Sequence, residues 1–80
     1  MGTTRREKPK RLPRKLLAIR QELGVSQTEM AKILGLNKTY TVVSSYERGT
    51  REPPLLTLLK YARLVGVSTD VLIDDKLNLP

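Results

Sequence analysis

The 80-residue chain contains neither cysteine nor histidine. Without cysteine it can form no disulfide bond, carry out no thiol chemistry and build no zinc–cysteine site. Without histidine it lacks the side chain that most often acts as a general base near neutral pH, so no serine has its usual activating partner. The sequence also has no glycine-rich phosphate loop. These absences argue against an enzyme, and we expect neither a cofactor nor a metal site.

Long apolar runs are missing as well. The longest uninterrupted run covers residues 16–19, whereas a membrane-spanning helix needs roughly 18 apolar residues. The run is also shorter than the apolar core of a secretory signal. No segment alternates between apolar and polar residues with a period of two, so the sequence predicts no sheet. We therefore expect a cytoplasmic, helical protein with no membrane partner.

Positive charge is concentrated at the start of the chain. The sequence has 15 Lys and Arg against 8 Asp and Glu, a net charge of +7. Residues 1–15 hold seven basic residues and one acid, whereas residues 16–80 hold eight and seven. This distribution indicates a polyanionic partner. Because residues 1–11 lack apolar periodicity, we predict a flexible basic arm there and a single helical domain over 12–80. The basic residues of the N-terminal segment are Arg5, Arg6, Lys8, Lys10, Arg11, Arg14 and Lys15.

Apolar residues at three- and four-residue spacing predict helices over about 13–23, 27–34 and 54–65. Another helix ends at Arg48, and a last one runs from a Ser68 cap to about residue 76. The short connections predict a compact, all-α, five-helix bundle. In the helix over 54–65, the residues expected to face inward are Leu55, Leu58, Leu59, Ala62 and Val65.

The ends of these helices have recognisable signals. Ser26 and Glu29 have the spacing of a capping box, in which each side chain accepts a hydrogen bond from the backbone of the other. Glycine, which enters the left-handed conformation without strain, closes four helices, at positions 24, 35, 49 and 66. Two short helices joined by a glycine turn, in a basic chain, indicate a helix that enters a DNA groove.

Several short motifs in this region also occur together in a known family. They are RQELGVSQ at 20–27, Ala31 with Leu34 and Gly35, YERG at 46–49, Pro53 or Pro54, and GVSTDVL at 66–72. With these motifs in this order, the chain resembles the lambda-repressor-like, or XRE-type, helix-turn-helix family over about residues 13–75. The resemblance implies a sequence-specific transcriptional regulator, by default a repressor, that reads double-stranded DNA in the major groove with the helix at about 38–48. Such a protein is nucleoid-associated when bound to DNA.

The resemblance implies roles for individual residues. Gln27 matches a residue that anchors a phosphate and often braces a side chain of the recognition helix. Ser26 matches the cap next to that phosphate. Arg20 and Glu47 match a partly buried ion pair that ties the first helix to the end of the recognition helix.

One departure from the family affects the turn. From the turn glycine to the acid of this ion pair there are twelve positions, two more than is usual. In one placement the turn is longer, with Asn37 and Lys38 in it and Thr39 as the cap. In the other, Asn37 is the cap and the recognition helix starts about half a turn earlier. Both placements keep Val43 and Tyr46 on the core side.

The outer face of the recognition helix is polar. Tyr40, Thr41, Ser44 and Ser45 are the expected base-reading residues, although the same pattern would suit an ordinary solvated face. Phosphate contacts position a protein on DNA and make its binding sensitive to salt. The residues expected to bind phosphates are Ser26, Gln27, Lys38, Thr39, Arg48 and Arg51. The basic arm is expected to lie along phosphates or in a minor groove, and Arg14 and Lys15 could instead face the DNA backbone from the first helix.

The C-terminal helix carries Val71, Leu72 and Ile73, with little chain left to cover them. We expect these residues to form a homodimer interface on an inverted-repeat operator; the alternative is that Val71 and Leu72 close the monomer core. We expect no second, sensing domain, so regulation would depend on concentration or a partner protein. The alternative function is an antitoxin-like or adaptor module whose main role is to bind a protein partner.

Overall fold

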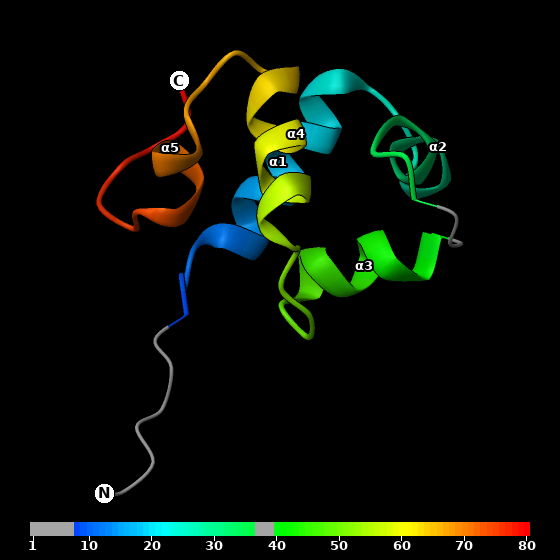
Figure 1. Cartoon of the computed structure of the whole chain (residues 1–80), viewed down its shortest axis with the longest axis horizontal. Helices are drawn as coiled ribbons and strands as arrows, with labels where there is room; N and C mark the ends of the chain where they lie inside the picture. The colour runs from blue at the N-terminus through cyan, green and yellow to red at the C-terminus, as the bar shows by residue number, and fades with distance from the viewer. Residues whose placement is uncertain (1–7, 37–39) are drawn as a thin grey trace, which may run out of the picture.

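Five helices account for the architecture of the residues that the structure describes, 8–36 and 40–80 of a computed structural model (Figure 1). They are α1 (Leu12–Leu23), α2 (Gln27–Ile33), α3 (Tyr40–Arg48), α4 (Leu55–Leu64) and α5 (Thr69–Ile73). No strand occurs within these two ranges. The predicted all-α, five-helix fold is therefore confirmed, with α2 packed against α3, α1 against α3 and α5, and α4 against α5.

The helix ends follow the local signals. Ser26 Oγ accepts a hydrogen bond from the Glu29 backbone N–H (3.1 Å), and the Glu29 carboxylate accepts one from the Ser26 N–H (2.9 Å). The predicted capping box is thus present, and these hydrogen bonds lower the pKa of Glu29. All four predicted glycine ends have a positive φ of 71–78°. At Gly49 a Cβ would also lie 3.1 Å from Pro13 Cγ, so conformation and space both favour glycine there.

Two expectations about α5 were wrong. Ser68 occupies the N-cap position, but its side chain makes no capping hydrogen bond. The helix ends at Ile73 and does not continue to about residue 76. Asp74 has an extended backbone conformation, and its carboxylate accepts a hydrogen bond from the Lys76 N–H (2.9 Å), which favours a turn over another helical turn.

All five helices contribute buried residues to the core. Tyr61 of α4 is fully buried in it. The stripe of α4 that faces the core consists of Thr57, Leu58, Tyr61 and Ala62. The buried apolar residues are Leu12, Leu16, Ile19, Met30, Ala31, Leu34, Val43, Tyr46, Leu58, Tyr61, Ala62 and Leu72.

The prediction that Leu55 faces inward was wrong, because its side chain is 83% exposed. Thr57 and Tyr61 belong to the buried stripe of α4. At about 3.6 residues per turn, the centre of this stripe lies to one side of Leu55, and Leu56 lies on the side of the helix opposite the core. Leu58 and Ala62 face the core as expected.

Lys15 belongs to α1 and to the interior, which corrects its assignment to the basic arm. Only 4% of the residue is exposed. Its Nζ donates hydrogen bonds to the carbonyl oxygens of Val71 (2.7 Å) and Asp74 (3.0 Å), at the C-terminal end of α5. A cation is favourable there because the last carbonyls of a helix carry partial negative charge. Burial lowers the pKa of Lys15, and the side chain is not available for the DNA backbone.

The start of α1 is capped by a residue from the other end of the chain. Arg11, at the N-cap position, makes no side-chain capping bond of its own. The Asp75 carboxylate instead accepts hydrogen bonds from the N–H groups of Lys10 and Arg11, both at 3.0 Å. The Arg11 guanidinium donates in turn to the Asp75 carbonyl (2.7 Å) and to Asn78 Oδ1. Residues 10 and 11 are thus attached to the domain, whereas residues 1–7 of the predicted arm lie outside the described residues.

We expect the substitution Asp75→Asn to destabilise the fold in a pH-dependent way. The N–H groups of Arg11 and Lys10 lower the pKa of Asp75, so its stabilising effect is present above the ordinary carboxyl pKa of about 3.9 and is lost as the pH falls through the lower, folded-state value. Thermal unfolding from pH 7 to pH 2.5 should show the variant melting lower than the parent at neutral pH, with the difference shrinking as the pH falls.

Glu22→Gln, at an exposed position of α1, is the matched control and should melt like the parent at neutral pH. A difference between Asp75→Asn and the parent that persists unchanged to pH 2.5 would contradict a role for the carboxylate charge.

Candidate nucleic-acid interface

An ion pair fixes the position of α3. Arg20 Nε lies 2.7 Å from Glu47 Oε2, and Arg20 Nη2 lies 3.1 Å from Glu47 Oε1. Arg20 Nη1 also donates to the Val25 carbonyl at 3.0 Å. The side chains of Arg20 and Glu47 are only 18% and 5% exposed, and the hydrogen bond with Glu47 raises the pKa of Arg20. The structure thus brings together the two residues that the resemblance pairs, and their bidentate geometry fixes the end of α3 against α1.

Gln27 joins the same network. Its Nε2 donates a hydrogen bond to Glu47 Oε1 at 3.0 Å, so α1, α2 and α3 meet at one carboxylate. Gln27 therefore connects the start of α2 to a side chain of α3. An amide side chain has a second N–H and a carbonyl oxygen, so this bond does not exhaust its hydrogen-bonding capacity.

The outward face of α3 carries the expected polar side chains. Tyr40 (51% exposed) and Thr41 are exposed, Ser44 and Ser45 are half-buried, and on the opposite side Val43 is buried with Tyr46. Ser45 Oγ donates to the Thr41 carbonyl at 2.9 Å, which directs its hydroxyl along the helix.

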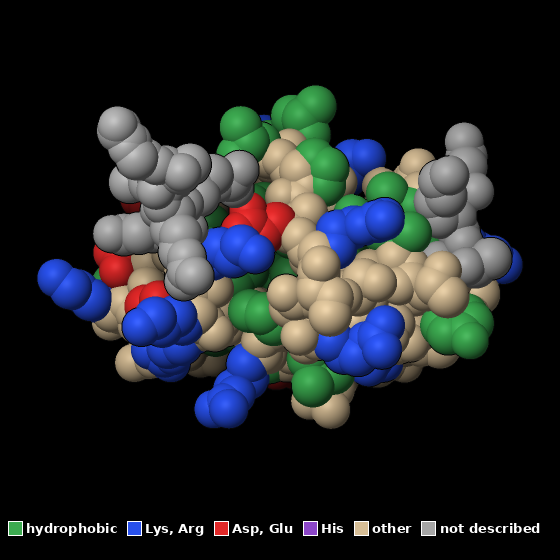
Figure 2. Space-filling model, turned by 90° about the horizontal axis from the view of Figure 1, so that it is seen from below, with side chains coloured by type: hydrophobic (Ala, Val, Ile, Leu, Met, Phe, Trp, Pro, Cys, Tyr) green, Lys and Arg blue, Asp and Glu red, His purple; other side chains and the backbone are tan. Residues whose placement is uncertain are grey.

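Cations lie around this face. Arg48 and Arg51 are exposed, and Arg48 Nε makes a long hydrogen bond of 3.4 Å to the Ser44 carbonyl. Seen from below, Lys and Arg side chains are spread across the surface, whereas Asp and Glu gather toward one side (Figure 2). Ser26 is exposed, and its hydroxyl accepts the capping-box hydrogen bond from the Glu29 N–H. Lys38 and Thr39 lie outside the described residues. So does the segment in which the two additional residues were expected.

Lys60 is a positioning residue that the sequence pattern did not reveal. Its Nζ donates to the Leu34 carbonyl at 2.9 Å, just after the last residue of α2. This bond satisfies a helix-end carbonyl and links α4 to the turn before α3. A lysine on the polar side of a helix looks like any surface cation, so no local signal indicated it.

The expected dimer residues separate into two groups. Leu72 is fully buried in the core, which is a correction, because a side chain without exposed surface cannot face a second copy. Val71 is half-buried, whereas Ile73 is 43% exposed. Leu72 thus closes the monomer core, the alternative that the sequence left open.

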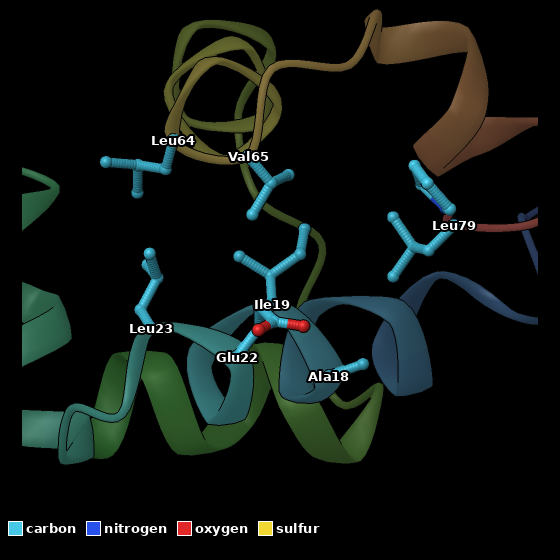
Figure 3. A pocket seen from close by; sticks show the side chains of 8 residues that line it. Ala18, Ile19, Glu22, Leu23, Leu64, Val65 and Leu79 are labelled. Atoms are coloured by element: carbon cyan, nitrogen blue, oxygen red, sulfur yellow. The ribbon is translucent and has the colours of Figure 1, made fainter.

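A groove of about 450 Å³ lies between α1 and the end of α4. In the close-up, Leu64 and Val65 of the α4 end lie above Ile19 and Leu23 of α1, and Leu79 enters from the side (Figure 3). Glu22 is the only charged residue in its lining, which is otherwise formed by Ala18, Ile19, Leu23, Leu64, Val65, Leu79 and Pro80.

Two classes of site are not found in 8–36 and 40–80. These residues contain no group of three or more acidic side chains placed to hold a metal ion. None of the helices in these ranges is long and apolar enough to cross a membrane.

Comparison with known proteins identifies the class. A helix-turn-helix family model matches residues 16–72, and the chain belongs to this family. It is similar to the HTH-type transcriptional regulator ImmR of Bacillus subtilis, with 40% identity over 62 residues, 78% of this chain and 47% of that protein. It is also similar to antitoxin HigA1 of Mycobacterium tuberculosis, with 32% identity over 68 residues, 85% and 44% of the two chains. The chain spans about half the length of these relatives.

Among solved structures, the chain is similar to the P22 c2 repressor protein in complex with synthetic operator 9T. The TM-score is 0.69 at 25% identity, over 80% of this chain and 94% of that one. The five-helix arrangement is therefore that of a lambda-like repressor.

We expect removal of one partner of the Arg20–Glu47 pair to be strongly destabilising. Glu47→Met strands a guanidinium that is 18% exposed, and the free energy of unfolding should fall by about 3 kcal/mol, the low end for breaking a buried pair. The double variant Arg20→Met/Glu47→Met should lose less than the sum of the two single variants, because it leaves no unpaired charge. Urea unfolding of all three measures this coupling.

Glu22→Met is the matched control, because Glu22 is an exposed acid on α1. It should change the free energy of unfolding by no more than about 0.5 kcal/mol. Strict additivity of the Arg20 and Glu47 substitutions would show that the two side chains act independently and would contradict the network.

Proposed function

We propose that this chain is a sequence-specific, double-stranded DNA-binding transcriptional regulator, acting as a repressor. The observation that carries this proposal is the network at Glu47, which holds α3 with Val43 inward and its polar residues outward. A recognition helix needs such an orientation, because its N-terminal side chains must reach base edges in the major groove. The relative named as a transcriptional regulator and the similarity to a repressor in complex with a synthetic operator support the proposal. The function is binding, with no catalytic step, and its location is cytoplasmic.

Tyr40, Thr41, Ser44 and Ser45 are the proposed base-reading residues. Hydroxyls discriminate less sharply than Arg or Gln, and the Thr methyl suits a thymine methyl. Phosphate contacts come from both sides of α3, where exposed Arg48 lies in its last turn and exposed Arg51 follows the helix. The residues proposed to bind phosphates are Ser26, Gln27, Lys38, Thr39, Arg48 and Arg51.

The protein acts as a homodimer on an inverted-repeat operator, which matches two-fold symmetry in the protein to two-fold symmetry in the DNA. The basic N-terminal residues add affinity. Since Lys10 and Arg11 are held by Asp75, the arm residues proposed to contact DNA are those that precede them in the sequence, Arg5, Arg6 and Lys8.

Thr41→Ala and Ser45→Ala should each relax the preference at particular base pairs. A good direct contact contributes about 1–3 kcal/mol of discrimination, so each variant should lose about that much at one position and little elsewhere. Fluorescence anisotropy measures this as the affinity of each variant for a set of duplexes, each of which carries one base-pair change in the preferred site. Thr28→Ala, at an exposed position of α2, is the control. An equal loss on every sequence would refute base reading by these residues.

Removing residues 1–7 should reduce the salt dependence of DNA binding. The slope of log K against log salt changes by about 0.9 for each phosphate that the protein neutralises, so removal of Arg5 and Arg6 should reduce the slope by up to about 1.8. Affinity measured from 50 to 300 mM KCl gives the slope. An unchanged slope would mean that these arginines do not bind phosphates.

A second candidate function is the binding of a protein partner, as in an antitoxin. The similarity to antitoxin HigA1 and the apolar groove between α1 and α4 favour it. A helix with apolar residues and one basic residue would suit this groove, because Glu22 is its only charged lining residue. If the chain binds no duplex DNA, whatever the sequence, that result would favour binding of a protein partner over DNA binding.

A further inference from the structure

The hydroxyl of Ser45 lies on the outward side of α3 and is already hydrogen-bonded within the helix. Ser45 follows Thr41 by one turn and lies about 200° around the helix from buried Val43. Its Oγ donates to the Thr41 carbonyl at 2.9 Å, and the residue is half-buried. A base that approaches this part of α3 therefore meets a hydroxyl whose single hydrogen is already engaged.

The backbone at Ser45 is held as well. Its carbonyl oxygen accepts hydrogen bonds from the Thr50 N–H (3.0 Å) and from Thr50 Oγ1 (3.3 Å), just beyond the end of α3. Two positions after Ser45, the Glu47 carboxylate is bonded to Arg20 and Gln27. The helix thus presents Ser45 from a fixed point, and only rotation of the hydroxyl itself changes what this side chain offers to a base.

A serine hydroxyl has one hydrogen to donate and two lone pairs that accept. While Ser45 Oγ donates to Thr41, a base amino group adds a hydrogen bond at no loss, because the lone pairs are free to accept it. A base acceptor instead faces these lone pairs. To bond it, the hydroxyl must rotate and give up the Thr41 carbonyl, and this exchange gains no hydrogen bond. The two kinds of base edge are therefore not equivalent to Ser45.

We propose that Ser45 acts only as an acceptor and selects a base with an amino group in the major groove, adenine at N6 or cytosine at N4. On the strand that it faces, Ser45 disfavours guanine and thymine, which present acceptors there. This inference rests on the proposed function, in which α3 enters the major groove. A serine without an internal bond suits donors and acceptors alike, so the Thr41 carbonyl gives Ser45 its preference.

The test removes single groups from the bases. Sequence selection with the parent and with Ser45→Ala first identifies the base pair whose preference depends on Ser45. At that pair, one duplex carries purine for adenine or pyrimidinone for cytosine, which removes the amino group. Other duplexes carry a 7-deazapurine, which lacks the N7 acceptor, or a thio-substituted base, whose O4 or O6 acceptor is weakened. Fluorescence anisotropy gives the affinity of each protein for each duplex.

The parent should bind the duplex without the amino group about fivefold more weakly than Ser45→Ala does, relative to the unmodified duplex, because one net hydrogen bond is lost. Comparison with Ser45→Ala corrects for the weaker pairing of the altered base. The duplexes with altered acceptors should show no such difference. Thr28→Ala, at an exposed position of α2, is the control and should behave like the parent. Circular dichroism checks that both variants remain folded.

A loss specific to the duplexes with altered acceptors would show that Ser45 donates to the base, and would overturn the inference. So would equal behaviour of the parent and Ser45→Ala on all duplexes. If the parent selects a sequence but Ser45→Ala changes no position of it, Ser45 reads no base and this inference alone fails. If the parent selects no sequence at all, the proposed function fails with it.

Discussion

The position of α3 depends on the carboxylate of Glu47. It accepts hydrogen bonds from Arg20 of α1 and Gln27 of α2, at 2.7–3.1 Å, while its side chain is only 5% exposed. In such surroundings water screens the charges poorly, so the Arg20–Glu47 ion pair keeps its geometry. Removing one partner leaves an unpaired charge and lowers the free energy of unfolding. Three consecutive helices are thereby fixed at one point. The polar face of α3 points outward because this network and the buried Val43 define its rotation.

A second set of bonds joins the two ends of the chain. Lys15 caps the end of α5, Asp75 caps the start of α1, and Arg11 donates back to the Asp75 carbonyl. A five-residue helix such as α5 is too short to be stable alone, so these bonds and the buried Leu72 keep it in place. They also hold residues 10 and 11 against the domain. Lys15 stabilises the fold, whereas a role in DNA binding is proposed for the basic residues nearer the N-terminus.

Local signals in the sequence predicted much of the fold. The capping box at Ser26 and the glycine ends of the helices depend on neighbouring residues, and the pairing of Arg20 with Glu47 was implied by the family resemblance. The bonds of Lys15, Asp75 and Lys60 could not be predicted, because their partners lie 26 to 65 positions away. Helical periodicity also identifies a stripe of apolar residues without fixing which side the neighbouring helices cover. For that reason Leu55, which was expected to face the core, is exposed, and Leu72, which was expected at a dimer interface, is buried.

We propose that α3, held by the Glu47 network, reads a specific DNA sequence. Bound sequences should be selected from a random duplex pool with the parent protein, at about 0.15 M salt, where phosphate contacts alone bind weakly. We expect an enriched inverted repeat whose half-sites lie about 34–36 Å apart. A pool that stays random after repeated rounds, while the protein remains folded, would contradict it.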